Sequence, residues 1–141
     1  MIAEIVARLK DAAPDLADVL PAEDIERLTK ATAPKSGTAF VLPYRERAEP
    51  NQRATGGHLQ MVAVQFLVAF VIRQYDARGG KRALAFDDFR SAIERALAGW
   101  TPPSAEEPLE LVGGQATALG NGASIYVQTW QTSRFLEGSD K

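Results

Sequence analysis

The stretch HLQMVAVQFLVAFVIRQYD, residues 58–76, is the most apolar part of the 141-residue chain. Three structures are open to such a stretch: a membrane span, a buried helix or a strand. Its apolar core covers residues 61–72 and already contains Gln65, whereas a helix needs about 20 apolar residues to cross a bilayer. The stretch is therefore too short for a membrane span, and we expect no membrane association.

Alternation within this stretch favours a strand over a helix. The even-numbered positions are all bulky, and in a strand they would share one face: Val62, Val64, Phe66, Val68, Phe70 and Ile72. A helix would scatter these side chains around its axis, and helices disfavour so many Val and Ile residues. We expect a long central strand that is buried on both faces, with helices over the bulkier face and with Phe66 and Phe70 in the core.

The composition is that of one folded domain, which we expect to span residues 1–141. Apolar residues make up 45% of the chain and charged residues 24%, as in globular proteins. The formal net charge is −2, with Lys and Arg spread along the chain, which argues against a basic nucleic-acid-binding face. The absence of cysteine excludes disulfides, thiol nucleophiles and cysteine-ligated metals. The start, MIAEIVARLKDAAP, mixes charged with apolar residues and is not a signal peptide.

Two helices are predicted near the N-terminus. The first is amphipathic and ends before Pro14, and residues 16–20 would add a further turn. The second opens at Pro21 and ends before Pro34.

A third helix is predicted within residues 83–100. Asp87 would cap its start and Gly99 would end it. Its buried stripe contains Ile93 and Leu97, and Trp100 would fold back against that stripe. Trp130, which lies later in the chain, could be either buried or exposed.

The other strands are predicted at residues 38–44, 109–119 and 123–135. Pro43 indicates an edge position or a bulge in the first of them, and the GNG sequence between the last two indicates a hairpin. Residues 45–57 are polar, charged and rich in Gly and Pro, so we expect a mobile loop there, and a disordered tail at residues 136–141. The predicted fold class is α+β, a mostly antiparallel β-sheet flanked by helices in the order ααββαββ.

No catalytic or metal-binding constellation stands out. His58 is the sole histidine, and a loop residue is a simpler interpretation of it than a base or a metal ligand. Asp87 and Asp88 would point about 100° apart on a helix, so capping explains them better than paired acid–base chemistry. The glycine pairs at 56–57, 79–80 and 113–114 match no phosphate-binding motif. We expect no enzymatic activity, no metal and no cofactor.

Three arginines, Arg45, Arg47 and Arg53, lie in the expected loop and are partly balanced by Glu46 and Glu49. A solvated loop is the simpler interpretation of this cluster. A contact surface for a partner is the alternative.

Several features together resemble a known family. They are the order of the elements, the apolar strand ending in VIRQYD, the helix end ALAGWTPP with PLEL after it, and the C-terminal IYVQTWQTSRF. The chain resembles, from about Ile2 to Phe135, the tail terminator proteins of long-tailed bacteriophages and prophages, including the small tail proteins of Mu-like phages.

This resemblance implies a non-enzymatic assembly protein with an α+β fold. Proteins of this family form a ring, commonly a hexamer, on the end of the completed tail tube, where they stop tube polymerisation and offer a surface for head docking. The implied partners are further copies of the chain, the tail-tube protein and the head–tail connector proteins, with no sequence recognition of nucleic acid. The implied location is the bacterial host cytoplasm during assembly and then the virion tail. Our hypothesis is that Arg45, Arg47 and Arg53 face the tube or head partner.

A second class of function stays open from the residues alone. The chain could be a small non-enzymatic domain that binds a ligand or a protein as a monomer or dimer, with residues 45–57 as a lid. Oligomeric state discriminates between the two, because a ring of identical subunits needs different complementary patches on its two flanks.

Overall fold

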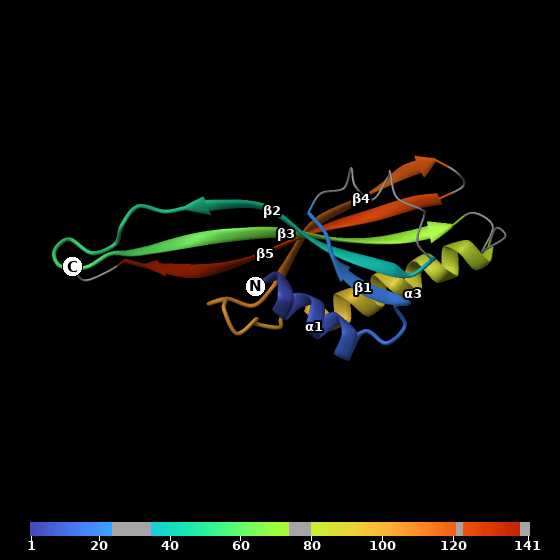
Figure 1. Cartoon of the computed structure of the whole chain (residues 1–141), viewed down its shortest axis with the longest axis horizontal. Helices are drawn as coiled ribbons and strands as arrows, with labels where there is room; N and C mark the ends of the chain where they lie inside the picture. Colours follow the sequence, from blue (N-terminus) through green and yellow to red (C-terminus); the bar gives the residue numbers. More distant parts are fainter. Residues whose placement is uncertain (24–34, 74–79, 121–122, 139–141) are drawn as a thin grey trace.

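The computed structural model describes residues 1–23, 35–73, 80–120 and 123–138. These residues form an α+β fold, as predicted (Figure 1). In chain order the elements are α1 (Ile2–Ala12), β1 (Asp18–Pro21), β2 (Thr38–Ala48), β3 (Leu59–Arg73), α3 (Gly80–Leu97), β4 (Glu110–Gly120) and β5 (Ala123–Glu137).

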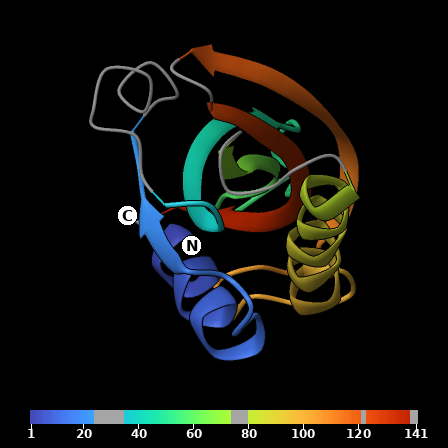
Figure 2. The ribbon, with the colours of Figure 1, turned by 90° about the vertical axis from the view of Figure 1, so that its right-hand side faces the viewer.

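The five strands form one sheet in the order β1-β2-β3-β5-β4. Only β1 and β2 are parallel, and the other three pairings are antiparallel, so the prediction of a mostly antiparallel sheet is confirmed. The apolar stretch is the central strand β3, which pairs with β5 from Leu59 to Arg73. Strong twist makes the sheet curl around its long axis (Figure 2).

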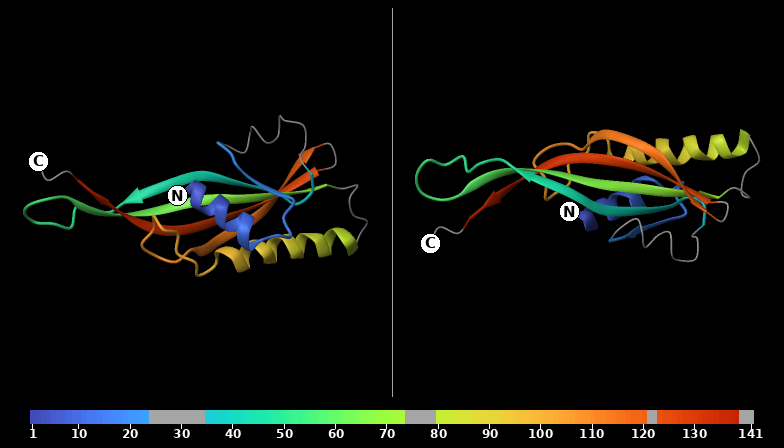
Figure 3. Two further views of the ribbon diagram at one scale, coloured as in Figure 1. Left: turned by 60° about the horizontal axis from the view of Figure 1, so that its bottom comes forward. Right: turned by 90° about the horizontal axis from the view of Figure 1, so that it is seen from above.

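Helices α1 and α3 lie on the same side of the sheet, against the bulkier face of β3 (Figures 2 and 3). Four even-numbered residues of β3 enter one core cluster with α1 and α3: Phe66, Val68, Phe70 and Ile72. In this cluster Phe66, Phe70, Ile93 and Leu97 are at most 1% exposed. Trp100 is half-buried at its margin, with the Arg8 guanidinium 5.2 Å from the ring centroid.

The curl of the sheet buries the other face of β3. A second cluster on this concave side joins apolar residues of β2, β3 and β5: Phe40, Leu42, Ala69, Val71, Ala123, Ile125 and Val127. The central strand is therefore buried on both faces along its helix-covered half, which explains why both its even and odd positions are apolar.

Residues 16–20 correct the prediction of an added helical turn. Asp18–Pro21 forms the short strand β1, in which Val19 is buried. Pro21 therefore ends a strand instead of opening a helix. Pairing with Thr38–Val41 fixes this strand, and such a nonlocal contact leaves no periodic signal in four residues. The rest of the predicted second helix, residues 24–34, lies outside the described residues.

Helix α3 begins earlier than predicted. It starts at Gly80, so Asp87 lies inside the helix and not at its cap. There Asp87 pairs with Arg90 across one turn, at an oxygen–nitrogen distance of 3.0 Å. The other end is as predicted, because Gly99 takes a left-handed conformation with φ +79° after the last helical residue, Leu97.

Strand β2 is longer than predicted. It continues to Ala48, so residues 45–48 of the expected loop are paired with β3. The bulge predicted from Pro43 is confirmed, because the register shifts between Pro43 and Arg45. Strand β5 likewise extends to Glu137, two residues into the expected tail.

Candidate interaction surface

Three strands extend beyond the helices as an arm (Figures 1 and 3). We define the arm as residues 44–48 of β2, 59–65 of β3 and 131–137 of β5, which are hydrogen-bonded side by side. Residues 49–58 connect β2 to β3 at its tip. Among the described helices, neither α1 nor α3 extends along this part of the sheet (Figure 1). Its edge residues 44–48 are exposed, whereas Val62, Val64, Thr132 and Ser133 are buried.

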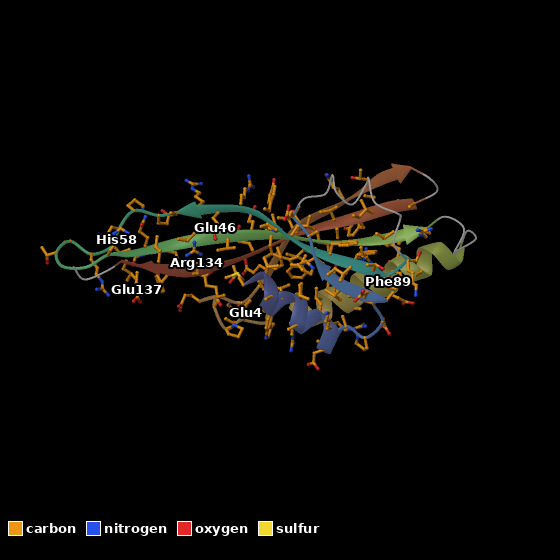
Figure 4. The ribbon with its side chains drawn as sticks, viewed as in Figure 1. Glu4, Glu46, His58, Phe89, Arg134 and Glu137 are labelled. Carbon is orange, nitrogen blue, oxygen red and sulfur yellow. The ribbon has the colours of Figure 1, made fainter. Side chains whose placement is uncertain are left out.

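The tip connection is anchored to β3 by specific hydrogen bonds. The Glu49 amide donates to the Met61 carbonyl at 2.8 Å, and the Asn51 side-chain oxygen accepts from the Leu59 amide at 2.8 Å. His58 lies here too, with Nε2 2.5 Å from Gln60 Oε1 (Figure 4). These contacts explain His58 as a structural residue of the tip.

One row of polar residues crosses the sheet at the base of the arm. Arg45 Nε donates to Gln65 Oε1 at 2.7 Å, and Gln65 Nε2 donates to Gln131 Oε1 at 2.7 Å. On β4, Glu110 is the register partner of Gln131. Opposed residues of antiparallel strands share a face, so this polar row has a basic end on β2 and an acidic end on β4.

Arg47 lies on the same face as Arg45, opposite Ala63 and nearer the tip. Together they line a groove of about 430 Å³ with Glu49, Ala63, Gln65 and Gln131. Arg53 does not join them, because it lies in the tip connection, where its amide donates to the Asn51 side chain at 3.2 Å. The structure thus brings together two of the three arginines.

The opposite face of the arm carries an ion pair that crosses β3. Arg134 on β5 donates to both carboxylate oxygens of Glu46 on β2, at 3.2 and 3.0 Å (Figure 4). The hydrogen bond to Glu46 is the main cause that raises the pKa of Arg134; electrostatic attraction to Glu46 adds to it, and partial burial opposes it. The pair ties the outer strands of the arm together.

The next register row along the strands is apolar, lies on the helix-covered face of the sheet and has a bulge at each edge. Its members are opposed in the register: Pro43, Phe66, Trp130 and Leu111. Phe66 and Trp130 in the middle are buried, at 1% and 0% exposure.

The extra residues of the two bulges are exposed apolar side chains. Tyr44 on β2 is 52% exposed and Val112 on β4 is 54% exposed. Both line a groove of about 430 Å³ on the concave face, together with Leu67, Val127 and Thr129. β-Bulges are common at sheet edges and near functional sites, where they reorient a side chain or end strand pairing.

Within residues 1–23, 35–73, 80–120 and 123–138, no group of three or more His, Cys, Asp or Glu residues could hold a metal ion. In the same ranges, no helix has the length and apolar character needed to cross a membrane.

Comparison with known proteins identifies the family. A sequence model described as phage tail terminator protein matches residues 2–139. The chain belongs to the phage tail terminator family. As a tail terminator it is a structural phage protein that takes part in tail completion and is located in the virion tail. Family membership implies contacts with other tail or virion components.

A solved structure is also similar to this tail terminator. It is described as the virion of a native gene transfer agent (GTA) particle, and one of its chains matches with a TM-score of 0.50 and 16% identity. The match covers 95% of this chain and 84% of that chain. At this identity the likeness supports the fold. A comparison with curated proteins gave no match.

Sequence reasoning missed the acidic end of the polar row and the apolar bulge residues of this tail terminator. Pro43 was a local signal for the bulge that exposes Tyr44. No local signal marks Glu110 or Val112, because their positions opposite Gln131 and near Leu111 depend on the strand register.

Proposed function

We propose that this tail terminator forms a ring, commonly of six copies in its family, on the end of the tail tube. The ring ends tube polymerisation and offers a surface on which the head docks, after assembly in the host cytoplasm. The partners are other copies of the chain, the tail-tube protein and the head–tail connector proteins. The observation that carries the proposal is the family match over residues 2–139.

The shape of the subunit supports this assignment. The arm projects away from the helices, and its tip connection is held in place by backbone and Asn51 contacts. In a ring, the arm of each subunit would reach a neighbouring layer of the virion. We assign the tip, with Arg53, to the tube or head partner.

Oligomeric state and tube binding test the proposal. Sedimentation velocity over a concentration series, with and without purified tail tubes, should show ring formation or binding at tube ends. Addition to growing tubes should stop their elongation, as measured by tube length in electron micrographs. A chain that stays monomeric with tubes present and leaves elongation unchanged would refute the proposal.

The role of the tip is tested by charge reversal. Arg53→Glu should weaken tube-end binding or head joining by at least about tenfold, because it places an acidic group where the partner meets a basic one. Asn51 and the backbone that anchor the tip stay unchanged. Lys10→Glu on α1, which has the same change of charge, is the matched control and should have no effect. Equal effects of the two variants would remove Arg53 from the contact.

A further inference from the structure

We propose that successive copies in the ring join edge to edge, with the outer edge of β2 in one copy against the outer edge of β4 in the next. Arg45 and Arg47 of one copy face Glu110 and Glu106 of its neighbour, and Tyr44 packs against Leu111 and Val112. This inference rests on the proposed ring and names the surfaces that close it.

Both edges are open among the described residues. Strand β1 pairs only with Thr38–Val41, so no described strand covers β2 from Leu42 to Ala48. Strand β4 pairs with β5 alone. From Leu111 to Gly120 it contains no charged residue and no proline, although proteins commonly use these residues to prevent pairing at an exposed edge.

The strand directions suit this junction. Strand β2 runs towards the tip of the arm, and the antiparallel pairings make β4 run away from it. When two copies stand side by side in the same orientation, β4 of one is antiparallel to β2 of the next. The antiparallel alternation of strand direction inside each subunit would therefore continue across the junction.

Charges on the two edges match at the same levels of the sheet. The polar row places Arg45 and Glu110 at its opposite ends on one face. A second row, nearer the tip, starts at Arg47 and passes through Ala63 to Ser133. There the Glu106 amide donates to the Ser133 carbonyl at 2.7 Å, which places Glu106 at the level of Arg47.

The nearest charged groups leave these pairings available. Arg45, Arg47, Glu106 and Glu110 are all exposed. The contacts of Arg45 are to uncharged groups, the Gln65 amide oxygen and the Tyr44 ring, whose centroid lies 5.0 Å from the guanidinium carbon. Glu46 is on the other face and binds Arg134. Glu49 lines the same groove as the arginines, but it is one acid beside two cations, so the groove face of this edge keeps a net positive charge.

The apolar bulges match in the same way. Tyr44 and Val112 flank the two ends of the apolar row, next to Pro43 and Leu111. Rotation about a ring axis relates copies without a shift along that axis. If the strands run along the ring axis, such a rotation brings together complementary patches that lie at the same level on opposite edges of the subunit.

A charge swap tests the junction. Arg45→Glu and Glu110→Arg should each weaken self-association by at least about tenfold, and the double variant should return to within about threefold of the original chain. Association is measured by sedimentation and by the number of copies bound per tube end. Lys10→Glu on α1 is the matched control, because it reverses an exposed charge outside both edges and should leave self-association and tube-end occupancy unchanged.

Cross-linking tests the geometry in a chain that has no cysteine of its own. A mixture of Tyr44→Cys and Val112→Cys proteins should form a disulfide-linked heterodimer under assembly conditions, whereas each protein alone should not dimerise. Leu20→Cys on β1, which is also exposed, replaces Tyr44→Cys in the control mixture and should not cross-link. Circular dichroism establishes that each variant is folded.

The outcomes separate this inference from the proposed function. If the unaltered chain forms no oligomer, alone or on tubes, both are wrong. If it forms rings but the charge swap gives no rescue and residues 44 and 112 do not cross-link, the edge junction is wrong and the ring stands. Cross-linking of Val112→Cys with itself would instead indicate a twofold contact of β4 edges, which also overturns the junction.

Discussion

Gly114 shows how a single residue shapes the edge strand. A β-carbon at this position would lie 2.8 Å from Cζ of Tyr126. The Tyr126 ring cannot easily move away, because it packs against Phe70 and Phe86 at centroid distances of 5.6 and 4.8 Å. The glycine pair at 113–114, which matches no phosphate-binding motif, is thus explained in part by packing: Gly114 leaves room for the Tyr126 side chain of the neighbouring strand β5.

We predict that Gly114→Ala lowers the free energy of unfolding by about 1–3 kcal/mol, because the added methyl group overpacks this cluster. Gly113→Ala is the matched control. A β-carbon there would meet nothing within 4 Å, so its effect should be below about 0.5 kcal/mol. Urea unfolding followed by circular dichroism measures both. Similar values for the two variants would show that Tyr126 does not restrict position 114.

At the scale of elements, helix α3 is held to the sheet by one apolar stripe. Ile93 and Leu97 are fully buried against β3, whereas Arg95 between them is exposed. The helix covers the face on which Phe70 lies, with the Phe89 ring centroid 5.9 Å from that of Phe70. Stability of the helix-covered half of the sheet therefore depends on this stripe.

We predict that Ile93→Ala costs about 2–5 kcal/mol of unfolding free energy, from lost burial and the cavity left behind. Arg95→Ala should change stability by less than about 0.5 kcal/mol. The measurement is the urea midpoint at constant slope. A small effect of Ile93→Ala would mean that α3 contributes little to folding of the sheet.

The sequence predicted these elements where periodicity was long. Alternation over residues 61–72 was enough to identify β3, and the spacing of Ile93 and Leu97 was enough for α3. It failed where pairing is nonlocal, as for β1, whose four residues are fixed by Thr38–Val41. The start of α3 was missed because the helix-forming residues before Asp87 extend the helix. The edge patches could not be predicted from the sequence, because Arg45 and Glu110 are aligned only through the register of the two strands between them, β3 and β5.

At the scale of the whole molecule, one face of the sheet carries a basic group at one edge and an acidic group at the other, although the net charge of the chain is only −2. Arg45 and Arg47 lie on one edge, and Glu106 and Glu110 on the other. Charges that are this exposed are screened by salt. Assembly through these edges should therefore be sensitive to ionic strength.

We predict that self-association weakens by roughly tenfold as salt rises from about 0.1 M to about 1 M, because the Debye length falls from about 10 Å to about 3 Å. A variant with Arg45→Gln and Arg47→Gln should associate more weakly at low salt and show a flatter salt dependence. Sedimentation equilibrium at several salt concentrations measures both. Association that strengthens with salt would indicate that the apolar bulges dominate the contact.

Strands β3 and β5 each pass without interruption from the helix-covered half into the arm, paired along fifteen positions from Leu59 to Arg73. A push at the tip is consequently carried as tension and compression along two continuous backbones, and no hinge separates the tip from the core. We therefore expect the subunit to act as a lever, so that seating of one end on a neighbouring layer of the virion would tilt the other end. Copies joined at their edges would then tilt in concert.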